Sequence, residues 1–176
     1  VISLSGIAVK TSIRVAGNTF TQAIIKYVRD NYSILIGEKM AEQIKIEVGS
    51  VFFDEDKEYE AKGRNLLTGL PTKKIITRRE IYPCIIEVAD QIVEQIPNIL
   101  SQTPPELSSD IFDNGIILTG GGALLDGLDK YINEKTKTKC VIAEDPIGCV
   151  ALGTGLAFDY LGKLVDGFVN PSTCQH

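Results

Sequence analysis

A run of three glycines, Gly120 to Gly122, is the strongest chemical signal in the chain, because it separates an apolar run from a helical pattern. The apolar run is Ile116-Ile117-Leu118-Thr119, and a helix is expected to begin at about Ala123. Glycine permits positive φ and lets another group come into contact with the backbone. The first turn of a helix adds unpaired N–H groups and the positive end of the helix dipole. This combination suits a nucleotide that lies against the turn.

The glycine motif matches neither of the common phosphate-binding fingerprints. It lacks the GxxxxGK[ST] pattern of a P-loop, and Leu125 stands where a dinucleotide fingerprint would have its third glycine. A tight structural turn without a ligand therefore stays open as an interpretation of the residues alone. Gly153-Thr154-Gly155 lies within a helical pattern, where close packing between helices explains the glycines better than a ligand does.

Glu42 and Lys45 are the charged pair most suited to binding chemistry. They fall within a predicted helix, 38–48, whose apolar residues Ala41, Ile44 and Val48 share one face. Because Glu42 and Lys45 are three residues apart, they point the same way. On spacing alone, a solvated helix face accounts for them.

Composition excludes several other classes of function. The chain has 176 residues, 44% hydrophobic and 23% charged, with a net charge of −5, which indicates a folded globular protein. The acidic balance argues against a nucleic-acid partner, which needs a basic surface. No apolar run approaches the roughly 20 residues that span a bilayer. No metal ligand set is predicted, because the cysteines form no CxxC pair and the single histidine is His176.

The four cysteines are Cys84, Cys140, Cys149 and Cys174. The first three sit among apolar residues, which favours buried, reduced thiols in a cytosolic protein.

Around these motifs, the pattern predicts alternating strands and helices. A capping box at Thr77-Arg78-Arg79-Glu80 opens a long helix over 81–100, in which Pro83 delays entry and Pro97 causes a kink. The strands over 116–119 and 139–143 are expected to be buried on both faces. The remaining predicted elements are strands over 1–4, 7–15, 59–63 and 73–77, helices over 19–31 and 147–164, and a flexible tail over 166–176.

This alternation predicts the α/β class. Segments 1–17 and 80–165 are expected to form one core, with 18–79 as an inserted small α+β subdomain. The chain lacks an initiator methionine and opens on Val1-Ile2-Ser3-Leu4, a pattern typical of the middle of a strand. The sequence is therefore expected to be a fragment.

Many short segments occur in an order that resembles one protein family, the MreB/Mbl type of bacterial actin, over about residues 1–165. Pro83, Pro97 and the cysteine-containing tail depart from the family pattern. The matching segments are Ile13-Arg14-Val15-Ala16-Gly17, Tyr27-Val28-Arg29, Leu35-Ile36-Gly37-Glu38, Ala41-Glu42-x-Ile44-Lys45-x-Glu47, Gly63-Arg64-Asn65, Thr68-Gly69-Leu70-Pro71, Thr103-Pro104-Pro105-Glu106-Leu107, Leu118-Thr119-Gly120-Gly121-Gly122-Ala123-Leu124-Leu125 and Ala143-Glu144-Asp145-Pro146.

The resemblance implies an actin-like ATPase fold, in which two lobes with ribonuclease H-like cores close on ATP and Mg²⁺. This chain would be the second lobe, with ATP, or GTP as the alternative, as its nucleotide. In the family's manner, Glu42 would accept from ribose hydroxyls, the stem of Lys45 would pack on the base, and the glycine backbone would cradle the other side. The implied adenosine-contacting residues are Glu42, Gln43, Ile44, Lys45, Gly120, Gly121, Gly122 and Ala123.

The family's phosphate loops and its water-positioning acid are expected upstream. No catalytic residue is therefore assigned here, and the chain alone is expected not to hydrolyse ATP appreciably. The resemblance further implies self-association into filaments in the cytoplasm, on the inner face of the membrane. There the complete protein would determine cell shape by organising wall synthesis, with the cell-wall elongation machinery as its partner.

Two other functions are alternatives to that of a cytoskeletal filament protein. The first is a different actin-superfamily ATPase, either a sugar or acetate kinase or a heat-shock chaperone. The second is an α/β module without a nucleotide, in which Gly120 to Gly122 form only a turn.

Overall fold

The computed structural model describes residues 1–3, 6–52 and 55–159, except for the side chain of Asp159. Helices and strands alternate along the chain. In order, they are β1 (Ile2–Ser3), β2 (Gly6–Ile7), α1 (Gly17–Tyr32), β3 (Ile34–Leu35), α2 (Glu38–Val48), β4 (Glu58–Asn65), β5 (Pro71–Thr77), α3 (Arg78–Val93), α4 (Gln95–Gln102), α5 (Pro105–Asn114), β6 (Ile116–Leu118), the 3₁₀ helix η1 (Gly121–Leu124), α6 (Leu128–Thr136), β7 (Cys140–Ile142) and α7 (Gly148–Asp159).

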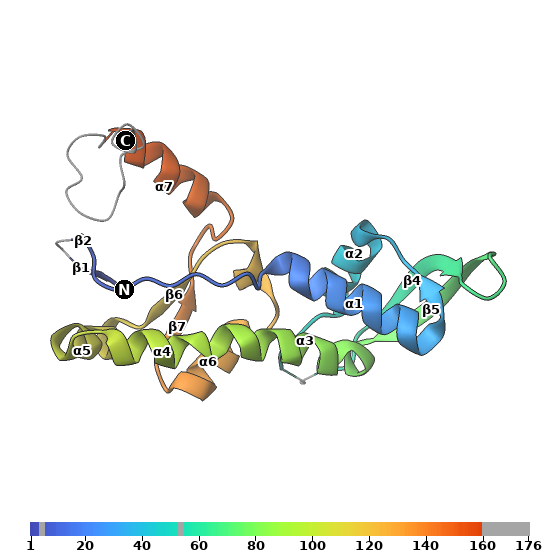
Figure 1. Cartoon of the computed structure of the whole chain (residues 1–176), viewed down its shortest axis with the longest axis horizontal. Helices are drawn as coiled ribbons and strands as arrows, with labels where there is room; N and C mark the ends of the chain where they lie inside the picture. The colour runs from blue at the N-terminus through green and yellow to red at the C-terminus, as the bar shows by residue number, and fades with distance from the viewer. Residues whose placement is uncertain (4–5, 53–54, 160–176) are drawn as a thin grey trace, which may run out of the picture.

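The described part of the molecule is elongated (Figure 1). Helices α3, α4 and α5 follow one another along one side, with α1 and the β4–β5 hairpin at one end. The β1–β2 pair and α7 lie towards the other end. The parallel pair β6–β7 and helix α6 lie between the two ends, so the glycine-rich segment after β6 is central.

Helices α1 and α2 form because each carries an apolar stripe at helical spacing. Helix α2 has the predicted bounds, whereas α1 begins two residues before the predicted start at Thr19. There the Thr19 hydroxyl accepts a hydrogen bond from the backbone N–H of Ala16 at 3.2 Å. The buried stripes are Phe20, Ile24 and Val28 in α1 and Ala41, Ile44 and Val48 in α2.

A three-stranded antiparallel sheet, in the order β3-β4-β5, closes the same end of the molecule. The predicted hairpin is confirmed, and its strands are longer than expected. Asn65 shapes its turn, because the Asn65 side-chain oxygen accepts from the N–H groups of Leu67 at 2.9 Å and Thr68 at 3.0 Å. Gly69 then takes a left-handed φ of 72°, which glycine adopts readily.

The long helix predicted over 81–100 is divided at Glu94 into α3 and α4. Pro97 explains the break, because it has no N–H to donate and its ring would clash with the carbonyl four residues earlier. The predicted delay at Pro83 is wrong, since α3 begins at Arg78 and runs through this proline. The predicted capping box is confirmed: the Thr77 N–H donates to Glu80 Oε2 at 2.7 Å, and the Glu80 N–H donates to Thr77 Oγ1 at 3.3 Å.

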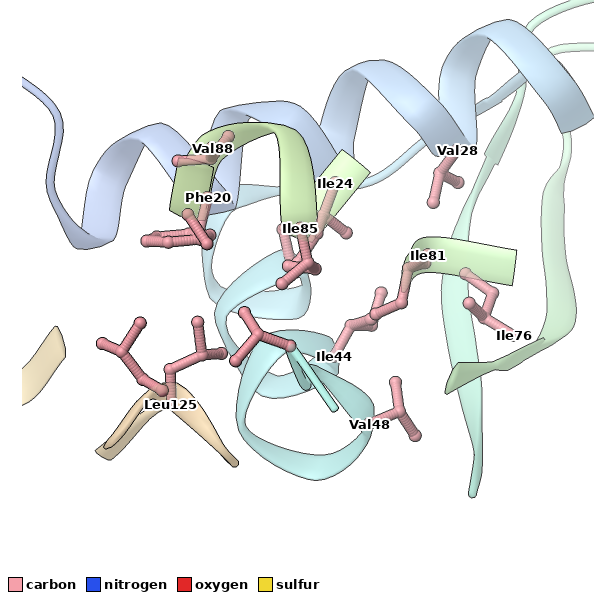
Figure 2. Packing of buried hydrophobic residues seen from close by; sticks show 14 of the residues in the cluster. Phe20, Ile24, Val28, Ile44, Val48, Ile76, Ile81, Ile85, Val88 and Leu125 are labelled. Atoms are coloured by element: carbon pink, nitrogen blue, oxygen red, sulfur yellow. The ribbon is translucent and has the colours of Figure 1, made fainter. Parts of the chain in front are cut away.

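One cluster of buried residues joins α1, α2, the small sheet and α3, and it continues into α6 (Figure 2). It crosses the expected subdomain boundary at residue 79, because Ile81 and Ile85 of α3 pack with Ile24 and Ile44. Helix α6 docks on α3, where the Tyr131 hydroxyl donates to the Asp90 carboxylate. The division into 1–17 with 80–165 and 18–79 stays a prediction.

The sheet elements outside this cluster differ from expectation. The strand predicted over 7–15 ends at Ile7, which pairs with Ile2. Beyond it, the N–H groups of Ala8 and Val9 both donate to the Val1 carbonyl, at 3.0 and 3.4 Å. The prediction that 116–119 and 139–143 are buried on both faces is wrong for the described residues. Ile117 is 66% exposed and Val141 38% exposed, because β6 and β7 form only a two-stranded sheet.

Helix α5 was not predicted, although Pro105 stands at a favourable first helical position. The last helix begins at Gly148, and the predicted residues 160–164 and the tail 166–176 lie outside the described residues. Cys84, Cys140 and Cys149 are free thiols, but only Cys140 is buried as predicted, because Cys84 and Cys149 are partly exposed; Cys174 lies outside the described residues.

Candidate nucleotide-binding site

Glu42, Lys45 and Thr21 form a hydrogen-bonded cluster between α1 and α2. Glu42 Oε2 accepts from Lys45 Nζ at 2.7 Å and from Thr21 Oγ1 at 2.9 Å. Lys45 Nζ also donates to the Gly17 carbonyl oxygen at 3.3 Å, so the lysine bridges α2 to the start of α1. The Lys45 side chain is only 15% exposed, whereas that of Glu42 is 45% exposed. The carboxylate therefore offers its outer face to a ligand while the ammonium holds it in place.

The surroundings of Glu42 keep it ionised. The hydrogen bond from Lys45 lowers the pKa of the Glu42 carboxyl, partial burial opposes this by raising it, and the Thr21 hydrogen bond lowers it further. A carboxylate held this way accepts hydrogen bonds and does not donate them, which suits sugar hydroxyls.

A polar pocket of about 550 Å³ opens beside this cluster. The volume lies within the usual range for small-molecule sites. It is lined by Asn18, Thr21, Gln22, Glu38, Lys39, Glu42 and Gln43. Sequence reasoning selected only the last two. The spacing of Asn18, Thr21 and Gln22, which puts them on one face of α1, is a signal that it could have used.

The glycine turn differs in detail from the prediction. The segment after β6 enters a short 3₁₀ helix, η1, instead of an α-helix at Ala123, and the next α-helix begins only at Leu128. The predicted binding contribution from the dipole of an α-helix that begins at Ala123 is therefore wrong for this turn. Gly120 has a φ of 82°, and its N–H donates to the Pro146 carbonyl at 2.5 Å, so the backbone here requires glycine.

Open space surrounds the three glycines. Among the residues that the structure describes, and apart from the chain neighbours, no heavy atom lies within 4 Å of a Cβ added at Gly120, Gly121 or Gly122. By contrast, a Cβ at Gly127 would lie 2.9 Å from the Cβ of Phe52, which shows that its backbone is packed. Gly120 to Gly122 are thus a stretch of backbone that another molecule can approach.

Contacts just after the turn join it to the end of α2. The Val51 N–H and the Ser50 hydroxyl each donate to the Asp126 carbonyl at 3.0 Å. Figure 2 shows Leu125 at the edge of the buried cluster, below Phe20 of α1 and beside α2. The structure therefore places both predicted segments on adjoining parts of one core, although the glycines do not line the 550 Å³ pocket.

The eight residues expected to contact adenosine fall into two groups. Glu42 and Gln43 line the pocket, the side chain of Lys45 is largely covered at 15% exposed, and Gly120 to Gly122 offer open backbone. The side chain of Ile44 is fully buried in the cluster and that of Ala123 is 4% exposed, so these two serve to position their neighbours.

Across residues 1–3, 6–52 and 55–159, no three His, Cys, Asp or Glu side chains gather as a metal site would require. Within those ranges, no helix combines the length and apolar character needed to cross a membrane.

The fold is of the actin-like α/β class. A family described as MreB/Mbl protein matches residues 1–166. The chain is 43% identical over 165 residues to the cell shape-determining protein Mbl of Bacillus subtilis, covering 93% of this chain and 50% of that protein. It is 47% identical over 162 residues to the cell shape-determining protein MreB of Escherichia coli K12, covering 92% and 47%.

A solved structure agrees with these sequence comparisons. MreB5 of Spiroplasma citri bound to AMPPNP superimposes with a TM-score of 0.82 and 37% identity, covering 89% of this chain and 47% of that one. The chain belongs to the MreB/Mbl family. It spans about half the length of the relatives it matches.

Proposed function

We propose that this chain supplies the adenosine-binding half of a nucleotide site in an actin-like filament protein that determines cell shape. The observation that carries the proposal is the pairing of an anchored carboxylate, Glu42, with an open glycine backbone on one core. The nucleotide is ATP, with GTP as the alternative. The AMPPNP bound by the related MreB5 supports an adenine nucleotide.

The residues of the chain fit such a ligand by their chemistry. Glu42 accepts hydrogen bonds from sugar hydroxyls, and the methylene stem of Lys45 offers apolar surface to a base. Open space at Gly121 and Gly122 leaves room for the other side of the nucleoside. A base that lies there would occupy the volume that a side chain at Gly121 would otherwise take.

Hydrolysis of the nucleotide is assigned to the complete protein. Mg²⁺ would arrive with the phosphates and supply charge neutralisation there, whereas the described residues of this chain hold no cluster for it. We expect the chain by itself not to hydrolyse ATP appreciably.

Self-association into filaments is the second part of the proposal. The turn of the β4–β5 hairpin carries Leu66, Leu67 and Leu70, which are 45%, 84% and 65% exposed. Grouped exposed leucines are a feature of protein–protein contacts. Such a contact between unlike surfaces of two copies repeats without closing, which generates an open filament. Filaments on the inner face of the membrane would then organise wall synthesis with the cell-wall elongation machinery.

The test is sedimentation of the protein extended to the length of its relatives, with and without ATP and Mg²⁺, with the pellets viewed by electron microscopy. Filaments that respond to nucleotide are the expected result. A protein that turns over ATP but stays in the supernatant across salt and lipid conditions would favour the kinase or chaperone reading. A protein that neither binds nucleotide nor pellets would leave only the α/β module.

A further inference from the structure

We propose that the ion pair between Arg78 and Asp126 fixes the position of the glycine turn relative to the α2 face of the nucleotide site. The inference rests on the proposed nucleotide site and adds a residue to it that no motif contains. Arg78 is the first residue of α3, and Asp126 lies two residues after the end of η1. The pair therefore joins the end of the small sheet to the segment that carries the open glycines.

The geometry makes the link asymmetric. Arg78 Nη2 lies 2.8 Å from Asp126 Oδ2, and the arginine side chain is 2% exposed whereas that of the aspartate is 51% exposed. The backbone of Arg78 is fixed as well, because its N–H donates to the Lys57 carbonyl at 2.8 Å and Arg78 lies within the Thr77–Glu80 capping box. The buried arginine side chain is thus fixed in position, and it in turn fixes the Asp126 carboxylate.

Asp126 is held from a second direction by α2. Its carbonyl accepts from the Val51 N–H and from the Ser50 hydroxyl, three residues or fewer beyond the end of α2 at Val48. The next residue, Gly127, has a φ of 77° and packs against Phe52, so the backbone there has little freedom. These contacts leave Gly120 to Gly122 as a loop with one end fixed at Asp126 and the other at Pro146.

The Arg78–Asp126 pair contributes to the position of the glycine turn more than to the stability of the fold. A buried arginine has a large desolvation cost, and replacing a buried ion pair by apolar residues of similar volume is often neutral for stability. The Asp126 carboxylate is half-exposed, so it stays solvated when the arginine is removed. The pair is therefore poorly explained as a source of fold stability, and a contribution to the placement of the turn accounts for it better.

The experiment compares nucleotide affinity with folding in the protein extended to the length of its relatives. Isothermal titration with ATP and Mg²⁺ is made on the wild type first, which tests the proposed site itself. We expect Arg78→Met to weaken ATP binding roughly tenfold while the cooperative thermal transition is retained, as for residues coupled within one network. Arg78→Lys should restore part of the affinity, because it keeps the charge but not the fork of donors.

Arg79→Met is the matched control, since Arg79 is the neighbouring arginine and its side chain is 74% exposed. It should leave ATP affinity unchanged. Hydrogen exchange by mass spectrometry gives an independent readout: the peptide spanning Gly120 to Leu125 should exchange faster in Arg78→Met and at the wild-type rate in Arg79→Met.

The outcomes are distinguishable. If the wild-type protein does not bind ATP, the proposed nucleotide site is wrong. A wild type that binds ATP, together with an Arg78→Met variant of equal affinity and equal exchange, overturns the positioning role alone. If Arg78→Met fails to fold, the double variant Arg78→Met/Asp126→Leu decides, because replacing both partners by apolar residues leaves no unpaired charge, and unchanged affinity and exchange there would again overturn the role.

Discussion

Lys45 holds Glu42 from three residues along the same helix, with 2.7 Å between the ammonium nitrogen and the carboxylate oxygen. An i, i+3 pair of this kind on an exposed helix contributes only a few tenths of a kcal/mol, roughly, to stability. Here the lysine is largely covered and also bonds the Gly17 carbonyl, so the pair fixes the direction of the carboxylate. A fixed acceptor at the rim of a polar pocket is better explained by a ligand than by helix stability.

We expect Glu42→Gln to weaken ATP binding about tenfold, because hydrogen bonds to a charged acceptor are worth more than those to a neutral one. Glu47→Gln is the matched control, since Glu47 lies on the same helix and is exposed outside the pocket. Titration calorimetry of the extended protein measures both. Equal affinity of the Glu42→Gln variant and the wild type would contradict the assigned role.

The pH dependence of binding should follow the lowered pKa of Glu42. A carboxyl whose folded pKa lies below its ordinary value of 4.5 keeps its charge, and its contribution, at every pH above that value. The contribution is lost only as the pH falls through the lowered folded pKa. ATP affinity, measured by titration calorimetry between pH 7 and pH 5, should therefore show no step due to Glu42. A midpoint inside that range that disappears in Glu42→Gln would show that the pKa is raised instead.

Gly121→Val should abolish detectable ATP binding without unfolding the protein. Apart from its chain neighbours, the new Cβ meets no described residue within 4 Å, and Gly121 does not have a positive φ, so the side chain would fill the space assigned to the nucleoside. Gly121→Ala, which is smaller, should weaken binding less. Circular dichroism melts recorded beside the titrations separate lost binding from lost structure. Gly121→Val binding ATP as the wild type does would support the reading of the glycines as a turn alone.

The local elements could be read from the sequence, because their signals are local. Helix α2, the β4–β5 hairpin and the Thr77–Glu80 capping box each depend on residues within a few positions of one another. The extent of the strand after Gly6 and the exposure of Ile117 depend instead on which strands pair with them. Periodicity reports that a segment is apolar, but it does not report how many neighbours cover it.

The same distinction holds for the site. Glu42 and the glycines stand out by type and by family resemblance, whereas Thr21 and Asp126 do not, since each gains its role from a partner far away in sequence. Thr21 bonds Glu42 across 21 positions, and Asp126 bonds Ser50 across 76. Only the packing of α1 on α2, and of the glycine segment on the end of α2, brings these pairs together.

Two isoleucines of α2 provide a test of the core. Ile44 is 0% exposed within the buried cluster and Ile46 is 63% exposed on the opposite side. Ile44→Ala should lower the free energy of unfolding by about 2–5 kcal/mol, because it leaves a cavity in a packed core. Ile46→Ala should change it by about 0.5 kcal/mol or less. Urea denaturation of both variants measures the difference, and equal losses would mean that α2 does not face the core as described.

The exposed hairpin turn yields the final prediction. Leu67 is the most exposed of its three leucines, and its N–H is held by the Asn65 side chain, so substitution there changes surface and leaves the turn intact. Leu67→Glu should raise the critical concentration for pelleting with ATP and Mg²⁺ by about tenfold, because a charge replaces apolar area at a contact between copies. Leu67→Met, which keeps the apolar area, should pellet like the wild type. ATP affinity, measured on unassembled protein, should be unaffected in both, since Leu67 does not line the pocket that holds Glu42. If Leu67→Glu pellets at the wild-type concentration, the leucines are not part of the filament contact.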